Sequence, residues 1–108
     1  MKAKIGIIGC SGIDELEELR GAQWKSVPSP FCNTSDKLLF GEINSVPIVF
    51  LPRHGRGHKL TPTAINYRAN IDALKRVGVT DLISLSAVGS LKEEYEPGNF
   101  VLVDQFID

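Results

Sequence analysis

Apolar residues in the first half of the chain form short continuous runs that end at glycines or turn residues. These runs occupy residues 3–9 (AKIGIIG), 37–43 (KLLFGEI) and 46–53 (VPIVFLPR). A continuous apolar run of this length, bounded by turn residues, is typical of a buried strand. Asn44 and Ser45 separate the second run from the third, as the turn of a β-hairpin would. The pattern therefore predicts three strands, the last two of them paired as a hairpin.

The segment 11–21 (SGIDELEELRG) carries its apolar residues at the spacing of an α-helix instead. Ile13, Leu16 and Leu19 would share one face of such a helix. Gly21 follows the last of them, where a glycine commonly ends a helix. We therefore expect a short helix directly after the first strand.

A second helical segment, residues 61–78, has start and stop signals at both ends. Thr61 can cap the helix, and Pro62 suits the first helical position. Gly78 closes the segment after two basic residues, which also favour a helix end. Apolar residues recur at helical spacing between these signals, and those expected to face the core are Ala64, Tyr67, Ile71 and Leu74.

Two further strands are expected in the last third of the chain. DLISLSA (81–87) has the composition of a buried strand, and GNFVLVDQFID (98–108) is a last apolar strand. Strands and helices alternate, which predicts an α/β fold with a mixed β-sheet flanked by helices. An apolar last strand needs a neighbouring strand and a covering helix. We therefore expect residues 1–108 to be a single, incomplete domain, the N-terminal part of a longer protein; completion by another chain is the alternative.

Composition and charge narrow the classes of partner. The chain has 108 residues, 43% of them hydrophobic and 23% charged, and a formal net charge of −1. This balance is ordinary for a globular domain and gives no general attraction to nucleic acid or to an anionic membrane. No apolar segment approaches the roughly 20 residues of a membrane span, and the first apolar run lacks the cleavage site of a signal peptide. We expect a cytoplasmic protein with Cys10 and Cys32 reduced, although a disulfide between them stays open.

Three loops leave the carboxyl ends of predicted strands, where open α/β sheets collect their ligands. The first is the turn GCSG (9–12). Its glycines allow close approach, its backbone N–H groups lie at the start of the expected helix, and the Ser11 hydroxyl adds a donor. These features suit an anion. A structural alternative stays open, because Ser11 and Asp14 also have the spacing of a helix-capping box.

The second loop, RHGRGH (53–58), concentrates basic residues directly after a predicted buried strand. The guanidinium groups of Arg53 and Arg56 can each bind a phosphate with two hydrogen bonds. His54 and His58 add two further donors. A solvated basic loop is one alternative to an anion site. A zinc site on the two histidines is another, which the adjacent arginines and the lack of a nearby carboxylate or thiolate disfavour.

The third loop, SAVGS (86–90), follows the strand expected at 81–87. Its small residues allow backbone N–H groups and a hydroxyl to face a ligand, although a plain exit from a strand is the alternative. A parallel sheet would bring this loop to the same edge as the other two. The sequence therefore predicts that all three loops hold one anion.

The glycines of the first strand and turn argue against a dinucleotide-binding protein. Gly6, Gly9 and Gly12 lie three residues apart, whereas the dinucleotide fingerprint needs its first two glycines two apart. No acidic residue ends a clear second strand about 20 residues further on, where it would hold a ribose. A nucleotide-binding module without catalysis, and a fragment whose exposed strand pairs with a partner chain, remain as alternatives.

The same stretches resemble the methylthioadenosine phosphorylase and purine nucleoside phosphorylase family. The resemblance covers nearly all 108 residues. The loop RHGRGH and the following PTAINYRAN resemble the methylthioadenosine branch in particular. The other stretches that carry the resemblance are IGIIGCSGID, PSPFCNTSD, ALKRVGV, SAVGSL and PGNFVLVDQFID.

The resemblance implies roles for residues of the three loops. Ser11 matches the phosphate-binding hydroxyl of the family's first turn, and Arg53 and His54 match its phosphate-binding Arg-His pair. Ser86 and Ala87 match the residues that contact phosphate and pentose. In addition, His58 lies where the family has a histidine near the 5′ substituent. Two departures are chemically mild: Cys10 replaces a glycine, and Ser86 replaces a threonine that is common there.

The resemblance also implies the reaction. The enzyme would use inorganic phosphate as its co-substrate. Its favoured reaction would convert 5′-methylthioadenosine into adenine and 5-methylthioribose 1-phosphate, as in purine and methionine salvage. Inosine, guanosine or methylthioinosine are alternative substrates. No metal and no organic cofactor are expected, and the full-length protein would be a homotrimer or hexamer. The general acid would lie beyond Asp108, so neither Asp104 nor Asp108 is assigned that role, and this chain alone would be inactive.

Overall fold

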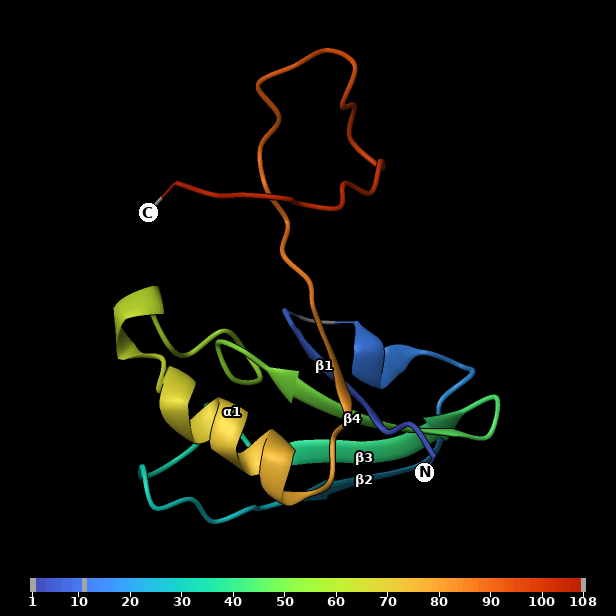
Figure 1. The fold of residues 1–108 in the computed structure, drawn as a ribbon, viewed down its shortest axis with the longest axis vertical. Helices are drawn as coiled ribbons and strands as arrows, with labels where there is room; N and C mark the ends of the chain where they lie inside the picture. Colours follow the sequence, from blue (N-terminus) through green and yellow to red (C-terminus); the bar gives the residue numbers. More distant parts are fainter. Residues whose placement is uncertain (1, 11, 108) are drawn as a thin grey trace.

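The computed structural model of the chain describes residues 2–10 and 12–107 (Figure 1). Within them lies a five-stranded sheet with the strand order β2-β3-β4-β1-β5. β1 runs parallel to β4 and β5, whereas β3 runs antiparallel to β2 and β4. This arrangement confirms the predicted α/β class with a mixed sheet. The strands are β1 (Ile5–Gly9), β2 (Arg20–Lys25), β3 (Leu38–Ile43), β4 (Val46–Pro52) and β5 (Asp81–Ser84).

The predicted hairpin is present as β3 and β4. Asn44 (φ 50°) and Ser45 (φ 65°) both adopt the left-handed conformation that a two-residue turn between right-twisted strands requires. The hairpin places β4 inside the sheet, so that Phe50 and Leu51 are 2% and 0% exposed. β4 is therefore the central apolar strand that its continuous run predicts.

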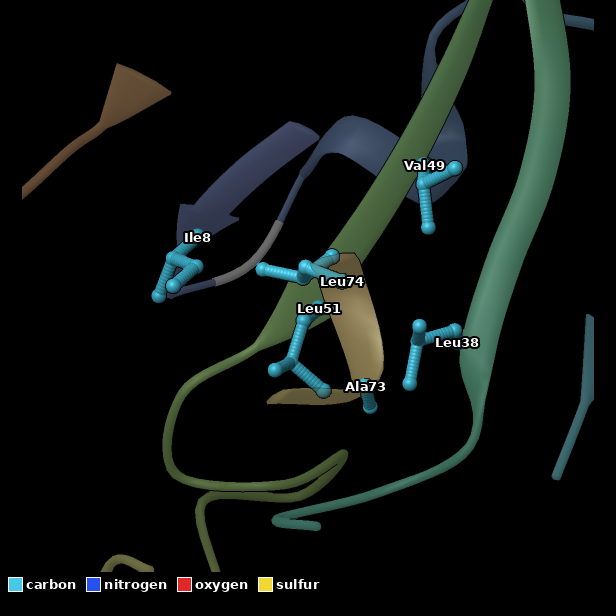
Figure 2. Close-up of a cluster of buried hydrophobic side chains, with 6 residues drawn as sticks. All are labelled: Ile8, Leu38, Val49, Leu51, Ala73 and Leu74. Carbon is cyan, nitrogen blue, oxygen red and sulfur yellow. The ribbon is translucent and has the colours of Figure 1, made fainter. Parts of the chain in front are cut away.

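The α-helix α1 (Tyr67–Arg76) packs on one face of the sheet. Figure 2 shows the cluster that joins them: side chains from β1, β3 and β4 meet two from α1. Its six members are Ile8, Leu38, Val49, Leu51, Ala73 and Leu74. This cluster fixes α1 against the sheet, with Lys4 donating from Nζ to the carbonyl of Val77 at the helix end (2.7 Å).

The helix predicted over residues 11–21 is wrong. Of the described residues there, Ile13–Glu15 form one short 3-10 turn, and the chain then enters β2 at Arg20. Leu19 explains the difference, because its side chain lies against Gly41 of β3, where a Cβ would meet Leu19 Cδ1 at 2.6 Å. Pairing with β3 thus gives this segment its tertiary contacts as a strand, and such contacts outweigh the helical pattern of a short segment.

The second helix is confirmed in place but begins later and turns a different face to the sheet. Pro62–Ala64 form a separate 3-10 turn, and Ile65 is extended (ψ 128°) before α1 begins. Asn66, not Thr61, caps α1 by accepting from the N–H of Ala69. This break changes the helical phase. Of the four residues predicted to face the core only Leu74 is buried, while Tyr67 and Ile71 are about half exposed, and the buried residues of α1 are Ala69, Asn70, Ala73 and Leu74.

The C-terminal third departs most from the prediction. β5 forms as an edge strand beside β1, but all four of its residues are exposed, not buried as predicted. Residues 98–107 form no strand, so the predicted last strand is wrong for the part that the structure describes. Figure 1 shows the chain beyond β5 leaving the sheet (orange to red). Among residues 2–10 and 12–107 no strand pairs with residues 98–107, and Phe100 and Leu102 are almost fully exposed.

Candidate functional site

The three candidate loops begin at one edge of the sheet. β4, β1 and β5 are adjacent and parallel, so their carboxyl ends lie side by side. Two backbone hydrogen bonds continue the pairing past the strand ends. The N–H of Arg53 donates to the carbonyl of Gly9 (2.9 Å), and the N–H of Leu85 donates to the carbonyl of Ile8 (2.8 Å). The loops at 53–58 and 86–90 therefore begin on either side of the end of β1, where the loop at 9–12 begins, and all three start at one edge of the sheet as predicted.

Arg53 connects these strand ends through its side chain. Its Nη1 donates to the carbonyl of Leu85 (3.2 Å), and its Nη2 lies 3.5 Å from Cys10 Sγ. The guanidinium is thus held between the ends of β1 and β5, and the side chain is half-buried. Among residues 2–10 and 12–107 none of the ion pairs uses Arg53. A fixed cation without a carboxylate partner at this edge can attract and orient an anion.

The two histidines of the second loop form one unit. His54 Nδ1 lies 2.8 Å from the carbonyl of Leu60, and because a carbonyl only accepts, this nitrogen carries the proton. The other ring nitrogen is then left for a ligand or water. His58 stacks on His54 with ring centroids 4.1 Å apart, and its backbone is left-handed (φ 54°). The loop therefore presents both imidazoles together on the carboxyl side of β4.

The third loop, residues 86–90, meets the second loop through Leu85, the residue that precedes it. Leu85 meets Arg53, but Ser86 and Ala87, which follow it, are exposed. Within the described parts of the chain, no hydrogen bond joins either residue to the 9–12 or 53–58 loops. Their predicted role in phosphate binding stays a prediction.

The first loop, residues 9–12, shows fewer of the features predicted for an anion site than the second loop does. Ser11, its predicted hydroxyl donor, lies outside the described residues, and so does the capping box that it would form with Asp14. The expected helix after the turn is a 3-10 turn of three residues, too short to supply a useful helix dipole. Gly12 is left-handed (φ 103°) with open space around it, so the backbone of this turn can still approach a ligand closely.

The sequence of residues 4–108 matches the Phosphorylase superfamily over almost the whole chain. This chain belongs to that superfamily. It is similar to the S-methyl-5′-thioadenosine phosphorylase of Bradyrhizobium diazoefficiens, with 62% identity over 107 residues, which are 99% of this chain and 37% of the relative. It is also similar to the enzyme of that name from Cereibacter sphaeroides, with 58% identity over 108 residues, 100% of this chain and 37% of the relative.

Solved structures give the same result for the fold. A methylthioadenosine phosphorylase from an Antarctic soil metagenomic library superimposes with a TM-score of 0.83 and 46% identity, over 89% of this chain and 33% of that structure. The methylthioadenosine phosphorylase of Schistosoma mansoni in complex with adenine gives a TM-score of 0.80 and 44% identity, over 91% and 35%. The superfamily fold is confirmed, and this chain spans about a third of the length of these relatives.

Neither a cluster of metal-ligating side chains nor a membrane-spanning helix is present in the described parts of the chain. No group of three or more His, Cys, Asp or Glu side chains able to hold a metal ion is found among residues 2–10 and 12–107, so the zinc alternative on His54 and His58 has no third ligand there. In the same residues no helix is long and apolar enough to cross a membrane. Cys10 and Cys32 are both free and exposed.

A structural contact that the sequence analysis missed holds the second loop from its other side. Asp36, just before β3, accepts hydrogen bonds from Arg56 Nε (2.9 Å), Arg56 Nη2 (3.0 Å) and the Arg56 backbone N–H (2.8 Å). Burial alone would raise the pKa of the Asp36 carboxyl, but the hydrogen bonds from Arg56 and from the N–H of Lys37 outweigh it and lower that pKa. Twenty residues separate the pair, and no local pattern in the sequence indicates it.

Gly55 and Gly57 of this phosphorylase loop offer a matched test of how tightly it is held. Both are left-handed (φ 78° and 77°), so alanine at either costs about 1–2 kcal/mol of backbone strain. A Cβ on Gly55 would also meet the carbonyl oxygen of Ser35 at 3.1 Å, whereas on Gly57 the nearest atom is Lys59 Cε at 3.8 Å. We expect Gly55→Ala to lower the free energy of unfolding, measured in urea, more than Gly57→Ala does. Equal losses would show that Ser35 does not constrain the loop.

Proposed function

We propose that this chain is the N-terminal portion, one domain in part, of a methylthioadenosine phosphorylase. The whole enzyme would use inorganic phosphate to convert 5′-methylthioadenosine into adenine and 5-methylthioribose 1-phosphate. The observation that carries the proposal is the guanidinium of Arg53, held at the carboxyl ends of three parallel strands without a carboxylate partner among the described residues. The names of the relatives support the choice of nucleoside.

The proposed reaction needs a phosphate anion held beside the sugar, and the positive charge of Arg53 suits that role. As the C1′–N9 bond breaks, positive charge builds on the sugar, as in other glycosyl transfers. A phosphate held beneath C1′ stabilises that charge, and one of its oxygens then forms the new bond to C1′. The electron pair of the broken bond leaves with the purine, which takes up a proton from a group outside this chain.

The ligands of the phosphate would come from all three loops. Arg53 would supply a cation, and His54, whose Nδ1 hydrogen is taken by the Leu60 carbonyl, would present Nε2. That nitrogen accepts from a phosphate hydroxyl when the ring is neutral and donates to a phosphate oxygen when the ring is charged. Ser11, Ser86 and Ala87 would complete the phosphate site, and His58, stacked on His54, would lie toward the 5′ substituent. A preformed set of donors orients the nucleophile without the cost of reorganising it during the reaction. Phosphate is the only co-substrate in this scheme, and the enzyme would be a cytoplasmic homotrimer or hexamer.

Phosphate dependence tests the proposal directly. In the whole enzyme we expect release of adenine from methylthioadenosine to require phosphate, with 5-methylthioribose 1-phosphate formed in equal amount. The measurement is the rate of adenine formation with and without phosphate, together with detection of the sugar phosphate. Adenine release that is equally fast without phosphate would identify a hydrolase, and binding of NAD without any turnover would identify a nucleotide-binding module.

A further inference from the structure

The two arginines of the RHGRGH loop make different kinds of contact. Arg53 reaches the ends of β1 and β5 and forms no ion pair within the described residues. Arg56, by contrast, makes two side-chain hydrogen bonds to the Asp36 carboxylate, at 2.9 and 3.0 Å. Its guanidinium also lies over the ring of Trp24 in β2, 4.0 Å from the centroid. The charge of Arg56 is therefore already neutralised on the β2–β3 side of the loop.

Asp36 is itself fixed to the rest of the fold. Its carboxylate accepts from the N–H of the next residue, Lys37 (2.7 Å), directly before β3. The neighbouring Ser35 is held by Asn70 of α1, which accepts from the Ser35 N–H (2.9 Å) and donates to the Ser35 hydroxyl (3.0 Å). Asn70 is only 2% exposed, so this attachment reaches the core. A continuous series of contacts thus runs from α1 through Ser35 and Asp36 to the second loop.

We infer that Asp36 is a positioning residue for phosphate: through Arg56 it holds the 53–58 loop so that Arg53 and His54 can bind the anion. The inference rests on the proposed function. It assigns Arg56 to loop support and not to phosphate, although the sequence offers both arginines equally. A carboxylate that binds the loop through a backbone N–H and two guanidinium hydrogen bonds fixes both position and orientation, which a single contact cannot do.

A double-mutant cycle in the whole enzyme tests this role. The variants are Asp36→Asn, Arg56→Gln and the double variant, and the measurements are KM for phosphate, KM for the nucleoside and kcat. We expect each single variant to raise KM for phosphate about 10-fold, because displacement of binding groups by an ångström is costly. The nucleoside KM should rise less than the phosphate KM, because His58 is the one residue of this loop that would lie toward the nucleoside. The double variant should be no worse than either single one, because the two residues act as a unit.

Asp72→Asn is the matched control, because Asp72 also pairs with an arginine, Arg76, one turn along α1 (2.6 Å). The Asp72→Asn variant should have the same KM for phosphate as the unsubstituted enzyme. If Asp36→Asn does not fold, Arg56→Gln carries the test, since its side chain is 47% exposed. An unchanged KM for phosphate in the single variants overturns the inference. A rise in KM for phosphate that is far larger in Arg56→Gln than in Asp36→Asn also overturns it, because Arg56 would then be a direct ligand of phosphate. If the unsubstituted enzyme needs no phosphate, the proposed function fails as well.

Discussion

Replacing Arg53 by alanine in the whole enzyme should lower kcat/KM for phosphate by about 10²–10³-fold, the usual cost of removing one preformed donor to a reacting oxyanion. The Arg53 side chain lies between the ends of β1 and β5, and none of the ion pairs among the described residues uses it. Its removal takes away a charge and up to two hydrogen bonds to phosphate. The measurement is the initial rate of adenine release as a function of phosphate concentration.

Two further substitutions make this result specific. Arg53→Lys keeps the charge but loses the planar pair of donors, so an intermediate loss is expected. Arg20→Ala removes an exposed arginine from β2, at the opposite edge of the sheet from β5, and should leave the phosphate kinetics unchanged. If Arg53→Ala has the same dependence on phosphate as the unsubstituted enzyme, Arg53 is not a phosphate ligand. The argument for an anion site at this edge would then lose its central group.

The parts of the fold that the sequence predicted correctly are those decided by local chemistry. The β3–β4 hairpin forms because Asn44 and Ser45 accept a left-handed backbone between two apolar runs. The convergence of the loops followed from the same reasoning, since β1, β4 and β5 read as continuous apolar strands and parallel strands place their exits together. The sequence therefore places Arg53 correctly at this edge of the sheet, while its role as a phosphate ligand stays a prediction.

The parts that the sequence did not predict depend on contacts between distant segments. The sequence RGAQWK of β2 has no strong apolar alternation, and it becomes a strand because Leu19 and the following residues meet β3. The face of α1 depends on the break at Ile65, which the Thr61-Pro62 signal concealed. The role of Asp36 depends on folding that brings it to Arg56. Helical periodicity and capping signals do not encode such partners.

The core offers the second large effect, on stability. Leu51→Ala in the chain of residues 1–108 should lower the free energy of unfolding by about 2–5 kcal/mol, the usual cost of such a truncation in a packed core. Leu51 is 0% exposed and belongs to the cluster that joins β4 to α1 (Figure 2). Since whole domains are stable by only about 5–15 kcal/mol, the loss is a large fraction of the total. Urea denaturation followed by circular dichroism measures it.

Leu91→Ala is the matched control for this truncation, because the same atoms are removed from a side chain that is fully exposed in the chain as described (103%). With no packing contacts to lose, its cost should lie within about 0.5 kcal/mol of zero. A similar loss in the two variants would mean that the cluster of β1, β3, β4 and α1 does not stabilise residues 1–108. Since that cluster also sets the position of β4, whose end carries Arg53 and His54, a small loss for Leu51→Ala would weaken the case for a preformed phosphate site.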